Sequence, residues 1–419
     1  MHIIVVDLGF GDCGKGTVVD HLCATRDVRA VVRFNGGAQA AHTVILPDGR
    51  KHTFAQFGAG TLRGVPTYLS RFTAVDPLSL VVEAEHLTAL GVPDVWSLLA
   101  VDGAALLTTP YHRLANQSRE RARGASRHGS CGMGVGETTA YALAHPADAL
   151  RAADCLSPGV LRAKLDRLRT RLGDATAPSV DAVMSAFTGF AGIVRMVDGV
   201  PLDEGPLVFE GAQGVLLDEW HGFHPHTTWS TTTFANAGAL LDGAPAYRLG
   251  VLRTVTTRHG TGPLPTEDPD LGLTDPNNPE NAWQGPFRFG HFDAPLHRYA
   301  LTAAGGVDGL ALTHLDLRVH RLCHGYRSNP LRVSSPAEVA QARVDQTPYL
   351  ARQAAMTTAL GRAEPEYARV TDWVGTVEAE LGAEVVLESW GPTSDDKISR
   401  LPLPQTGESA AKPRPQALV

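Results

Sequence analysis

A glycine-rich segment near the N-terminus carries residue types that bind phosphate. Gly9-x-x-x-x-Gly14-Lys15 has the spacing of a phosphate-binding loop, between a short apolar run and a helical pattern. Glycines let backbone N–H groups approach phosphate oxygens, the helix N-terminus adds the positive end of its dipole, and Lys15 adds a charge. The alternative is a tight turn with a surface lysine. Taken alone, the loop predicts only that a phosphate binds.

Two features of this loop depart from the usual pattern. Gly16 stands where Ser or Thr normally follows the lysine, and Thr17 comes one place later. Asp12 puts a carboxylate inside a loop built for phosphates, where it would repel the ligand unless a divalent cation or a substrate proton lies between them. Asp12 is therefore a candidate Mg²⁺ ligand, a candidate general base, or both.

The elements that position this loop follow an alternating pattern. Apolar runs predict strands at residues 3–6, 30–33, 207–210, 249–256, 309–313 and 384–388. Amphipathic spacing predicts helices from about residue 15 and at 77–90, 180–197, 296–304, 336–343 and 372–381. We expect an α/β fold with a large, mostly parallel central sheet, a P-loop-like nucleotide site and helical insertions. Residues 1–401 are expected to form one domain, with a loop at 268–282 and a frayed tail at 402–419.

Composition excludes several classes of function. The 419 residues carry a formal net charge of -7, so there is no overall basic field to hold a nucleic-acid backbone. Five scattered cysteines form no C-x-x-C pair, which argues against a disulfide framework and fits a reducing cytoplasm. No uncharged apolar run approaches the roughly 20 residues needed to span a bilayer. We therefore expect neither a nucleic-acid partner nor a membrane partner.

Five blocks in order along the chain resemble the signature segments of adenylosuccinate synthetases. They lie at residues 11–16 (GDCGKG), 33–43 (RFNGGAQAAHT), 209–218 (FEGAQGVLLD), 256–267 (TTRHGTGPLPTE) and 313–316 (THLD). Together they span most of the chain. The resemblance implies a two-step ligase reaction, in which GTP phosphorylates the 6-oxygen of IMP and the amine of aspartate then displaces phosphate.

The resemblance also implies roles for the residues that would catalyse this reaction. Asp12 would remove the N1 proton of the purine, and His42 would donate a hydrogen bond to the phosphoryl group as charge develops there. Gln213 would complete the catalytic set. Mg²⁺ would bridge the phosphates, held by Asp12 and the backbone carbonyl of Ala41. The alternative for His42 is a capping or core histidine.

Further residues match the nucleotide-binding positions of the family. The phosphates would contact Gly11, Gly14, Lys15, Gly16 and Thr17. Asp316 would read the guanine N1 and N2 donors, His314 stands where a lysine normally packs on the base, and the turn with Ser389 and Gly391 would also contact the base. Within this turn, Trp390 would stack on a ring, or alternatively belong to the core.

The positions for the second nucleotide are matched less completely. Gln39, Gln213 and Thr228 fall on nucleotide-substrate positions, with Gln39 in place of an asparagine that has the same amide chemistry. Ser130 and Cys131 would contact a monophosphate, and Arg258 a ribose or phosphate.

Two loops depart from the family. In the amine-binding loop only Arg288 remains of a run of arginines, although two carboxylates on aspartate call for paired guanidinium forks. Met133 stands where an arginine serves the monophosphate, and the arginine that members lend to the neighbouring subunit is missing near His145. The amine donor, expected to be an amino acid, and the purine-like acceptor therefore stay open, as does GTP against ATP. A homodimer is implied by resemblance.

Three functions follow as hypotheses. The first is a nucleoside-triphosphate-dependent C–N ligase, either adenylosuccinate synthetase itself or a paralogue with altered substrates. The second is a nucleotide-binding regulatory protein without ligase chemistry, against which Asp12 and His42 argue. The third is a simple P-loop kinase or GTPase, against which the block at residues 256–267 argues.

Overall fold

A sheet of ten strands organises the protein, in a computed structural model that describes residues 1–124, 127–278 and 283–402. In spatial order the strands are β18 (Lys397–Ser399), β17 (Val385–Ser389), β14 (Gly309–Thr313), β11 (Ala246–Arg253), β1 (His2–Asp7), β10 (Leu207–Glu210), β2 (Ala30–Arg33), β5 (Thr67–Leu69), β7 (Leu99–Asp102) and β9 (Arg195–Val197). Neighbours in this described sheet run parallel apart from the β17–β18 pair. The expected mostly parallel α/β fold is confirmed.

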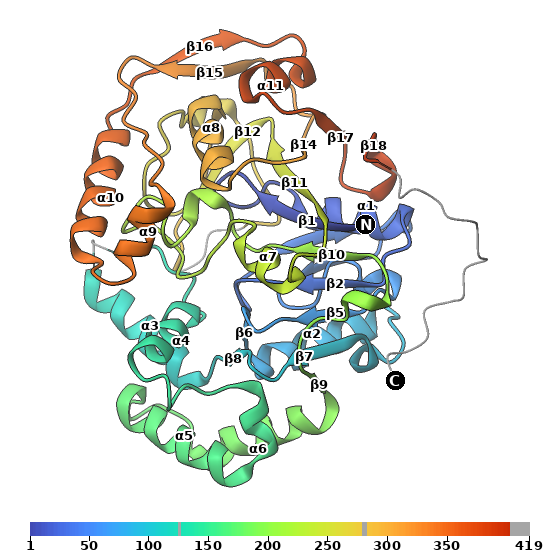
Figure 1. Cartoon of the computed structure of the whole chain (residues 1–419), viewed down its shortest axis with the longest axis vertical. Helices are drawn as coiled ribbons and strands as arrows, with labels where there is room; N and C mark the ends of the chain where they lie inside the picture. The colour runs from blue at the N-terminus through green and yellow to red at the C-terminus, as the bar shows by residue number, and fades with distance from the viewer. Residues whose placement is uncertain (125–126, 279–282, 403–419) are drawn as a thin grey trace.

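Helices cover both faces of this sheet, as the alternation of side chains along β1 requires. Ile3 and Val5 pack into one apolar cluster, and Ile4 and Val6 into the other. The first cluster includes side chains of α1 (Lys15–Thr25), α2 (Pro77–Ala89), α5 (Pro158–Leu172) and α6 (Val180–Ile193). The second includes side chains of α7 (Ala235–Leu241), α8 (Ala294–Ala303) and α11 (Trp373–Leu381). Figure 1 shows α5 and α6 at one end of the molecule, far from α8 and α11.

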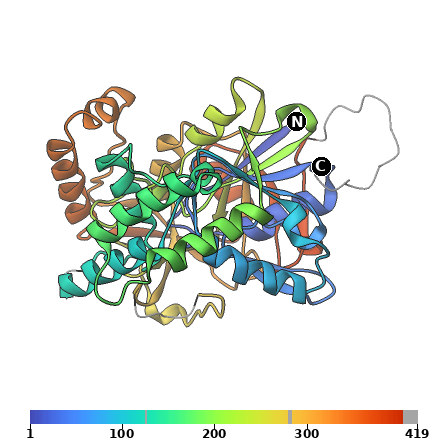
Figure 2. The same ribbon diagram turned by 90° about the horizontal axis from the view of Figure 1, so that it is seen from below.

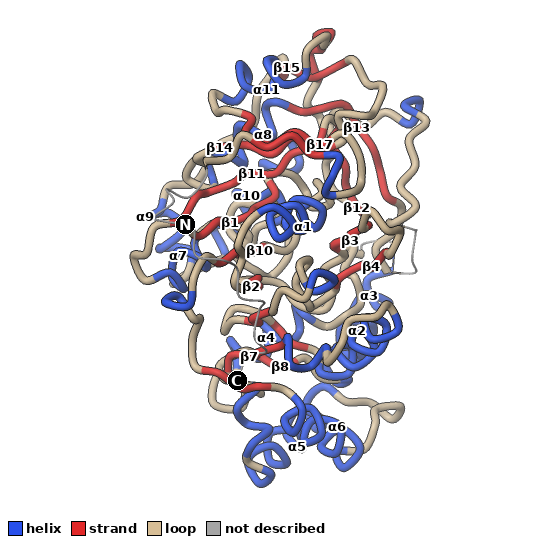
Figure 3. Tube along the Cα trace, turned by 90° about the vertical axis from the view of Figure 1, so that its right-hand side faces the viewer, coloured by secondary structure: helices blue, strands red, loops and turns tan. Residues whose placement is uncertain are grey.

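Smaller elements surround the main sheet. A second sheet has the order β12 (Val255–His259), β13 (Phe287–Asp293), β15 (Arg321–Tyr326) and β16 (Pro365–Arg369). Two strand pairs are β3 (His42–Ile45) with β4 (Lys51–Phe54), and β6 (Ala74–Val75) with β8 (Leu106–Leu107). The remaining helices are α3 (Pro110–Arg123), α4 (Val135–Ala144), α9 (Pro336–Ala342) and α10 (Thr347–Leu360). The α9–α10 pair projects from one side of the molecule in Figure 2, and β3 and β4 lie near α1 in Figure 3.

The expected elements are largely present, with two informative differences. The run expected as one strand at 249–256 is divided at Thr254 into β11 and β12, which belong to different sheets. The helix expected at 180–197 ends at Ile193, and its last residues form β9. Periodicity does not reveal either change, because apolar residues continue across both boundaries.

Two expectations concern segments that the structure covers only in part. The loop at 268–282 contains a short 3₁₀ turn, Pro269–Leu271, and its last four residues lie outside the described part. Nearly all of the tail expected at 402–419 also lies outside the described residues. Within the described chain, every helix is too short or too polar to cross a bilayer.

Candidate active site

The phosphate loop is held in shape by Asp7, the last residue of β1. Its carboxylate accepts hydrogen bonds from the backbone N–H groups of Gly9 (2.8 Å) and Cys13 (2.9 Å) and from Lys15 Nζ (2.8 Å). Burial acts to raise the pKa of Asp7, but the Lys15 ammonium and these hydrogen bonds hold it below its ordinary value. The loop is therefore preformed, and Lys15 is fixed by the same carboxylate.

The glycine after the lysine has a steric explanation. A Cβ atom at Gly16 would lie 3.0 Å from the backbone carbon and the Cβ of His42. A serine or threonine there would collide with β3, so the departure from the usual loop lets His42 approach the start of α1. Thr17 instead donates its hydroxyl to the carbonyl of Pro392 (2.8 Å), which joins α1 to the turn after β17.

Asp12 occupies a strained position at the tip of the loop. Its φ is +60°, in the left-handed region, and its carbonyl accepts from Nη1 of the buried Arg253 (3.1 Å). Burial raises the pKa of the Asp12 carboxyl, against the attraction of His259, Lys15 and Arg253. A carboxylate with a raised pKa is a stronger base than an exposed one, which suits proton removal from a ligand.

His42 is oriented by a buried carboxylate. Its Nδ1 lies 2.6 Å from Oε1 of Glu210, whose other oxygen accepts from the backbone N–H of Ala59 (3.0 Å). Burial lowers the pKa of His42 to about 4, although Glu210 acts in the opposite direction. Burial acts to raise the pKa of Glu210, yet His42 and Arg33 hold it below its ordinary value. Because an ionised carboxylate only accepts, Nδ1 carries the proton, and Nε2 is the nitrogen that can meet a ligand.

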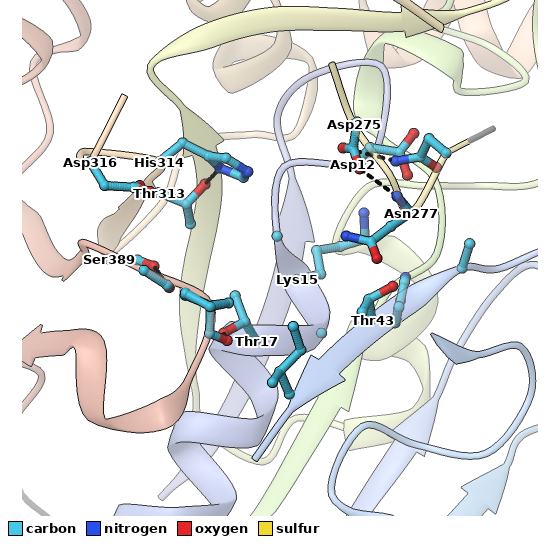
Figure 4. Close-up of a pocket in the computed structure, with 18 residues that line it drawn as sticks. Asp12, Lys15, Thr17, Thr43, Asp275, Asn277, Thr313, His314, Asp316 and Ser389 are labelled. Carbon is cyan, nitrogen blue, oxygen red and sulfur yellow. Dashed lines mark hydrogen bonds between the residues drawn. The ribbon is translucent and has the colours of Figure 1, made fainter. Parts of the chain in front are cut away.

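One cavity gathers most of the nucleotide-binding and catalytic residues predicted from the sequence. It is lined by Asp12, Gly14, Lys15, Gly16, Thr17, Ala41, His42, His314, Asp316, Ser389 and Gly391, among others. Figure 4 shows His314, Asp316 and Ser389 on one side of Lys15, and Asp12 on the other. The end with His314, Asp316 and Ser389, the residues predicted to contact a base, is called the nucleobase-like end below. The end with Asp12, beside the loop that His42 contacts at Gly16, is called the phosphate end.

The nucleobase-like end is built by the residues after β14 and β17. His314 has a φ of +58°, its carbonyl accepts from Thr254 Oγ1 (2.7 Å), and its Nδ1 lies 2.8 Å from Thr313 Oγ1. Burial lowers the pKa of His314 well below its ordinary value, so the ring is neutral. Trp390 is not a core residue. Its side chain is 48% exposed and its Nε1 donates to Glu388 (3.2 Å).

Sequence reasoning missed Lys397, which supports this end from β18. Its Nζ donates to the carbonyls of Gly391 (2.7 Å) and Thr393 (2.6 Å). Burial lowers the pKa of Lys397 to about 8, although Asp396 and Asp20 act to raise it. No local motif marks this lysine, because its contacts form only when β18 pairs with β17.

Sequence reasoning also missed three residues of the loop at 268–282 that line the phosphate end. Asp275 accepts from the backbone N–H of Asn277 (2.9 Å) and from Nδ2 of Asn278 (3.1 Å), and Oδ1 of Asn278 lies 3.1 Å from Nε2 of His259. In Figure 4 Asp275 and Asn277 lie beside Asp12. The density of Asp and Asn in this loop was the available signal, but it is also typical of an ordinary turn.

Gln39 and Gln213 lie together outside this cavity. A Cβ at Gly36 would be 3.3 Å from Gln213 Oε1, and one at Gly37 would be 3.1 Å from Gln39 Oε1. Both amide atoms of Gln213 and the oxygen of Gln39 are buried without a hydrogen-bond partner among the described residues. Buried amide groups that lack partners are available to a ligand. Gly11, also outside the cavity, packs near the Gln213 backbone.

Three further residues that the sequence predicts to bind substrate lie outside this cavity. Ser130 donates its hydroxyl to Asn116 Oδ1 (2.9 Å) and accepts from the N–H of Gly132 (3.2 Å). Burial raises the pKa of the Cys131 thiol. Thr228 donates its backbone N–H to the carbonyl of Leu217 (2.8 Å). None of the three lines the cavity of the phosphate loop.

The two predicted substrate arginines are engaged within the protein. Arg258 is 2% exposed, donates to the carbonyls of Thr261 (2.9 Å), Pro263 (3.2 Å) and His226 (3.2 Å), and lies over the Phe10 ring at 4.2 Å. Burial, and secondarily a neighbouring arginine, lower its pKa to about 9.

Arg288 is engaged in the same way. It donates to the carbonyls of Gly260 (2.8 Å) and Gly262 (2.8 Å) and forms an ion pair with Glu267 (2.6 Å). Both guanidinium groups thus hold the glycine-rich turn after β12.

The fold and the cavity together indicate the class of protein. A strand, a phosphate loop and a helix on a parallel sheet, with a carboxylate and an imidazole lining the same cavity, are typical of an enzyme that transfers phosphoryl groups from nucleotides. The family of adenylosuccinate synthetases matches residues 4–398, and the chain belongs to this family. Members of the family are C–N ligases that use a nucleoside triphosphate.

Two solved structures share the fold. The fully ligated adenylosuccinate synthetase from Plasmodium falciparum is 19% identical, with a TM-score of 0.78 over 95% of this chain and 99% of that chain. The cyanophage S-2L succinoaminodeoxyadenylate synthetase (PurZ), bound to dGMP and dATP as an energy donor, is 21% identical, with a TM-score of 0.58 over 94% of each chain. At these identities the likeness extends to the fold.

Proposed function

We propose that the protein phosphorylates the carbonyl oxygen of an oxo-purine nucleotide with a nucleoside triphosphate and then joins an amine to the same carbon. The reference reaction converts IMP, aspartate and GTP to adenylosuccinate, GDP and phosphate in purine biosynthesis. The observation that carries the proposal is that Asp12 and His42 line the same cavity as Lys15, with Asp12 at the end away from Asp316. A protein that only bound nucleotides would need neither group there.

In the first step, Asp12 takes the N1 proton of the purine as the 6-oxygen attacks the γ-phosphorus. The bond from that phosphorus to the bridging oxygen breaks, and the nucleoside diphosphate leaves. Anionic phosphates raise the pKa of His42 above its value in the ligand-free protein and favour the protonated ring. The Nδ1–H of His42 then keeps its hydrogen bond to Glu210, while Nε2–H donates to the phosphoryl oxygens as negative charge develops there.

In the second step, the amine nitrogen attacks the activated carbon and phosphate leaves with the former 6-oxygen. The amine enters as an ammonium ion and loses two protons, one carried away by the phosphate and one released to solvent. Asp12 releases the N1 proton to solvent as the products leave, so it is a base again for the next turnover. The loop residues Gly11, Gly14, Lys15, Gly16 and Thr17 hold the nucleotide phosphates. Their backbone N–H groups and the fixed ammonium of Lys15 position the γ-phosphorus for both steps.

The residues present fit a magnesium ion. Asp12 and Ala41 line the same cavity as Gly14, Lys15 and Gly16 of the phosphate loop, so the Asp12 carboxylate and the Ala41 carbonyl would hold the ion. The ion supplies charge neutralisation between the phosphates and Asp12. It also accounts for a carboxylate within a phosphate loop.

The acceptor is placed against the two unpartnered glutamines. Gln39 and Gln213 offer buried amide groups that match the alternating donors and acceptors of a purine nucleotide. By their match to family positions, Thr228 would contact the same nucleotide, and Ser130 and Cys131 would contact its 5'-phosphate. Arg258 and Arg288 act on substrates through the glycine-rich turn that they hold. The supporting observation is that both guanidinium groups already have protein partners.

A second candidate is a related ligase with other substrates. It is favoured by those occupied guanidinium groups and by Met133 in the loop for the monophosphate. The cyanophage relative binds dGMP and dATP, which makes a guanine-type acceptor and an adenine-type donor the first alternatives to test. The neutral His314 favours neither base. Asp316 and the turn with Ser389 and Gly391 favour guanine, because a carboxylate accepts from its N1 and N2 donors.

We further propose a cytoplasmic homodimer. Cys13, Cys23, Cys131, Cys155 and Cys323 are all unpaired, which fits a reducing compartment. Leu143 and Trp229 line a second cavity together with Gly36, beside the two glutamines, and are 63% and 43% exposed. A two-fold partner would bury them.

The test is a reconstituted reaction with the purified protein and Mg²⁺. GTP or ATP, IMP or dGMP, and aspartate are combined, and both phosphate release and the ultraviolet change on purine amination are followed. Amine-dependent release of phosphate, accompanied by the ultraviolet change, is the expected result. Nucleotide binding without phosphate release for any acceptor would identify a regulatory protein instead.

A further inference from the structure

The phosphate end of the cavity is acidic in a way that the first step does not require. Asp12 and Asp275 both line it, and Figure 4 shows the two side by side. The nearby cations do not balance them fully. Lys15 is paired with Asp7, and Arg253 contacts the Asp12 carbonyl while lying 3.9 Å from Oδ2 of Asp275. One carboxylate beyond those needed for the proposed base and metal ligand therefore faces the cavity.

The same end lacks groups that would hold a second carboxylate of a ligand. Among the described residues that line it, none is an arginine. The arginines closest in sequence to the expected amine loop, Arg258 and Arg288, donate to carbonyls and to Glu267. A dicarboxylate amine would need guanidinium forks or several N–H groups to replace the water around its anions.

Acceptor atoms without partners are placed here instead. Oδ1 of Asn277, which lines this end, is buried and has no hydrogen bond within the described chain. Nδ1 of His259 also has none among the described residues, but His259 is not part of the cavity lining. Nε2 of His259 lies 3.1 Å from the amide oxygen of Asn278, so it carries the ring proton and Nδ1 is an acceptor. The lining of this end thus offers a carboxylate and an amide oxygen, which both accept, to a ligand that donates.

We propose that Asp275 and Asn277 bind the ammonium group of the amine donor, and that this donor is an amine with at most one carboxylate, such as a small monocarboxylic amino acid. The inference rests on the proposed ligase function and names one of its substrates. An ammonium group brings three donors and one positive charge, which match the Asp275 carboxylate and the Asn277 oxygen. Its position beside Asp12 places the nitrogen near the carbon that is activated in the first step.

A metal ion is the rival occupant for Asp275. Each Asp275 oxygen already accepts one hydrogen bond, from the Asn277 N–H or from Asn278 Nδ2, so the Asp275 carboxylate and the Asn277 oxygen have few free acceptor positions, which suit the three donors of an ammonium. Mg²⁺ demands near-octahedral oxygen ligands at about 2.0–2.1 Å and usually keeps several waters.

The experiment measures amine binding without requiring turnover. Full-length protein is saturated with Mg²⁺ and a non-hydrolysable GTP analogue, and its melting temperature is titrated with glycine, aspartate, succinate and methylamine. Glycine and methylamine are expected to raise the melting temperature at lower concentrations than aspartate, and succinate, which lacks an ammonium group, to have no effect. Asp275→Asn should weaken glycine binding about tenfold or more, as expected for a lost charge-assisted hydrogen bond.

A matched control and the contrary outcomes complete the design. Asp270→Asn changes an exposed aspartate of the same loop that does not line the cavity, and it should leave glycine binding unchanged. Aspartate binding at least tenfold more tightly than glycine would overturn the proposal. So would an Asp275→Asn variant that loses affinity for Mg²⁺ but keeps its affinity for glycine. Absence of turnover with every acceptor, alongside intact glycine binding, would instead refute the ligase function alone.

Discussion

The phosphate end and the glycine-rich turn after β12 use their charged groups in opposite ways. At the phosphate end, Asp12 and His42 are fixed from behind, through the Asp12 carbonyl and the Nδ1 atom of His42, and their reactive atoms remain available to a ligand. In the turn, the guanidinium groups of Arg258 and Arg288 donate hydrogen bonds to backbone carbonyls of the protein itself. The first region thus keeps reactive atoms available to a ligand, whereas the second uses its charged groups to hold the fold of the turn.

The largest effect is expected at Asp12. Asp12→Asn removes the base but keeps the shape of the loop, so kcat should fall about 10³-fold or more, while the dissociation constant of the nucleotide changes less than about tenfold. Steady-state kinetics and equilibrium binding of GTP measure the two quantities. Asp48→Asn, on the exposed β3–β4 turn, is the control. Undiminished activity of Asp12→Asn would remove this carboxylate from the mechanism.

A smaller loss is expected when His42 is displaced without being changed. Gly16→Ser restores the usual P-loop residue, but its Cβ would lie 3.0 Å from His42 atoms. We expect kcat to fall about 10–100-fold, because small misplacements of a catalytic group have effects of this size. Gly136→Ser, in α4, where a Cβ would meet open space, is the matched control. A fully active Gly16→Ser enzyme would show that α1 and β3 need not approach so closely.

A substitution in the glycine-rich turn after β12 should lower the stability of the protein more than its affinity for the amine. Arg288→Ala removes an ion pair and two hydrogen bonds to carbonyls, and should lower the free energy of unfolding by about 2–4 kcal/mol. Urea unfolding measures this loss. The KM for the amine should change no more than the KM for the nucleotide. A selective rise of about tenfold in the amine KM, with unchanged stability, would identify Arg288 as a direct ligand of the amine. It would contradict the contrast between the phosphate end and the turn after β12.

The smallest effect concerns acid stability of the scaffold that holds Ser130. His112 in α3 is buried, and burial lowers its pKa to about 3, from an ordinary value near 6.5. Between these pH values the unfolded chain binds a proton there that the folded protein does not, so stability falls as pH drops from 6.5 toward 3. His112→Gln should flatten this slope by up to one proton in urea unfolding measured from pH 7 to pH 4. An unchanged slope would contradict the buried neutral ring.

The parts predictable from sequence are those that rest on local pattern. The phosphate loop, β1 and α1 follow from spacing and periodicity over about 25 residues, and the family blocks brought His42 and Asp316 to the same site. Gly16 looked like a departure, and only the distance to His42 explains it.

The remainder depends on contacts that no local motif marks. Lys397 supports a turn through strand pairing at the edge of the sheet, and Asp275 reaches the phosphate end from a loop whose composition predicted only a turn. The engagement of Arg258 could not be foreseen, because its carbonyl partners are set by the fold of a glycine-rich segment. The sequence shows that Arg258 is charged, but not that its guanidinium group bonds to carbonyls of the protein.

Positional isotope exchange tests the central claim most directly, because it detects phosphoryl transfer without needing the amine. GTP labelled with ¹⁸O in its β,γ-bridge is incubated with the protein, Mg²⁺ and IMP or dGMP, and the label is followed by phosphorus NMR. Scrambling that requires the acceptor and disappears in Asp12→Asn is the predicted result. Absence of scrambling with either acceptor, and with ATP in place of GTP, in a protein that binds the nucleotide would contradict an intact activating site.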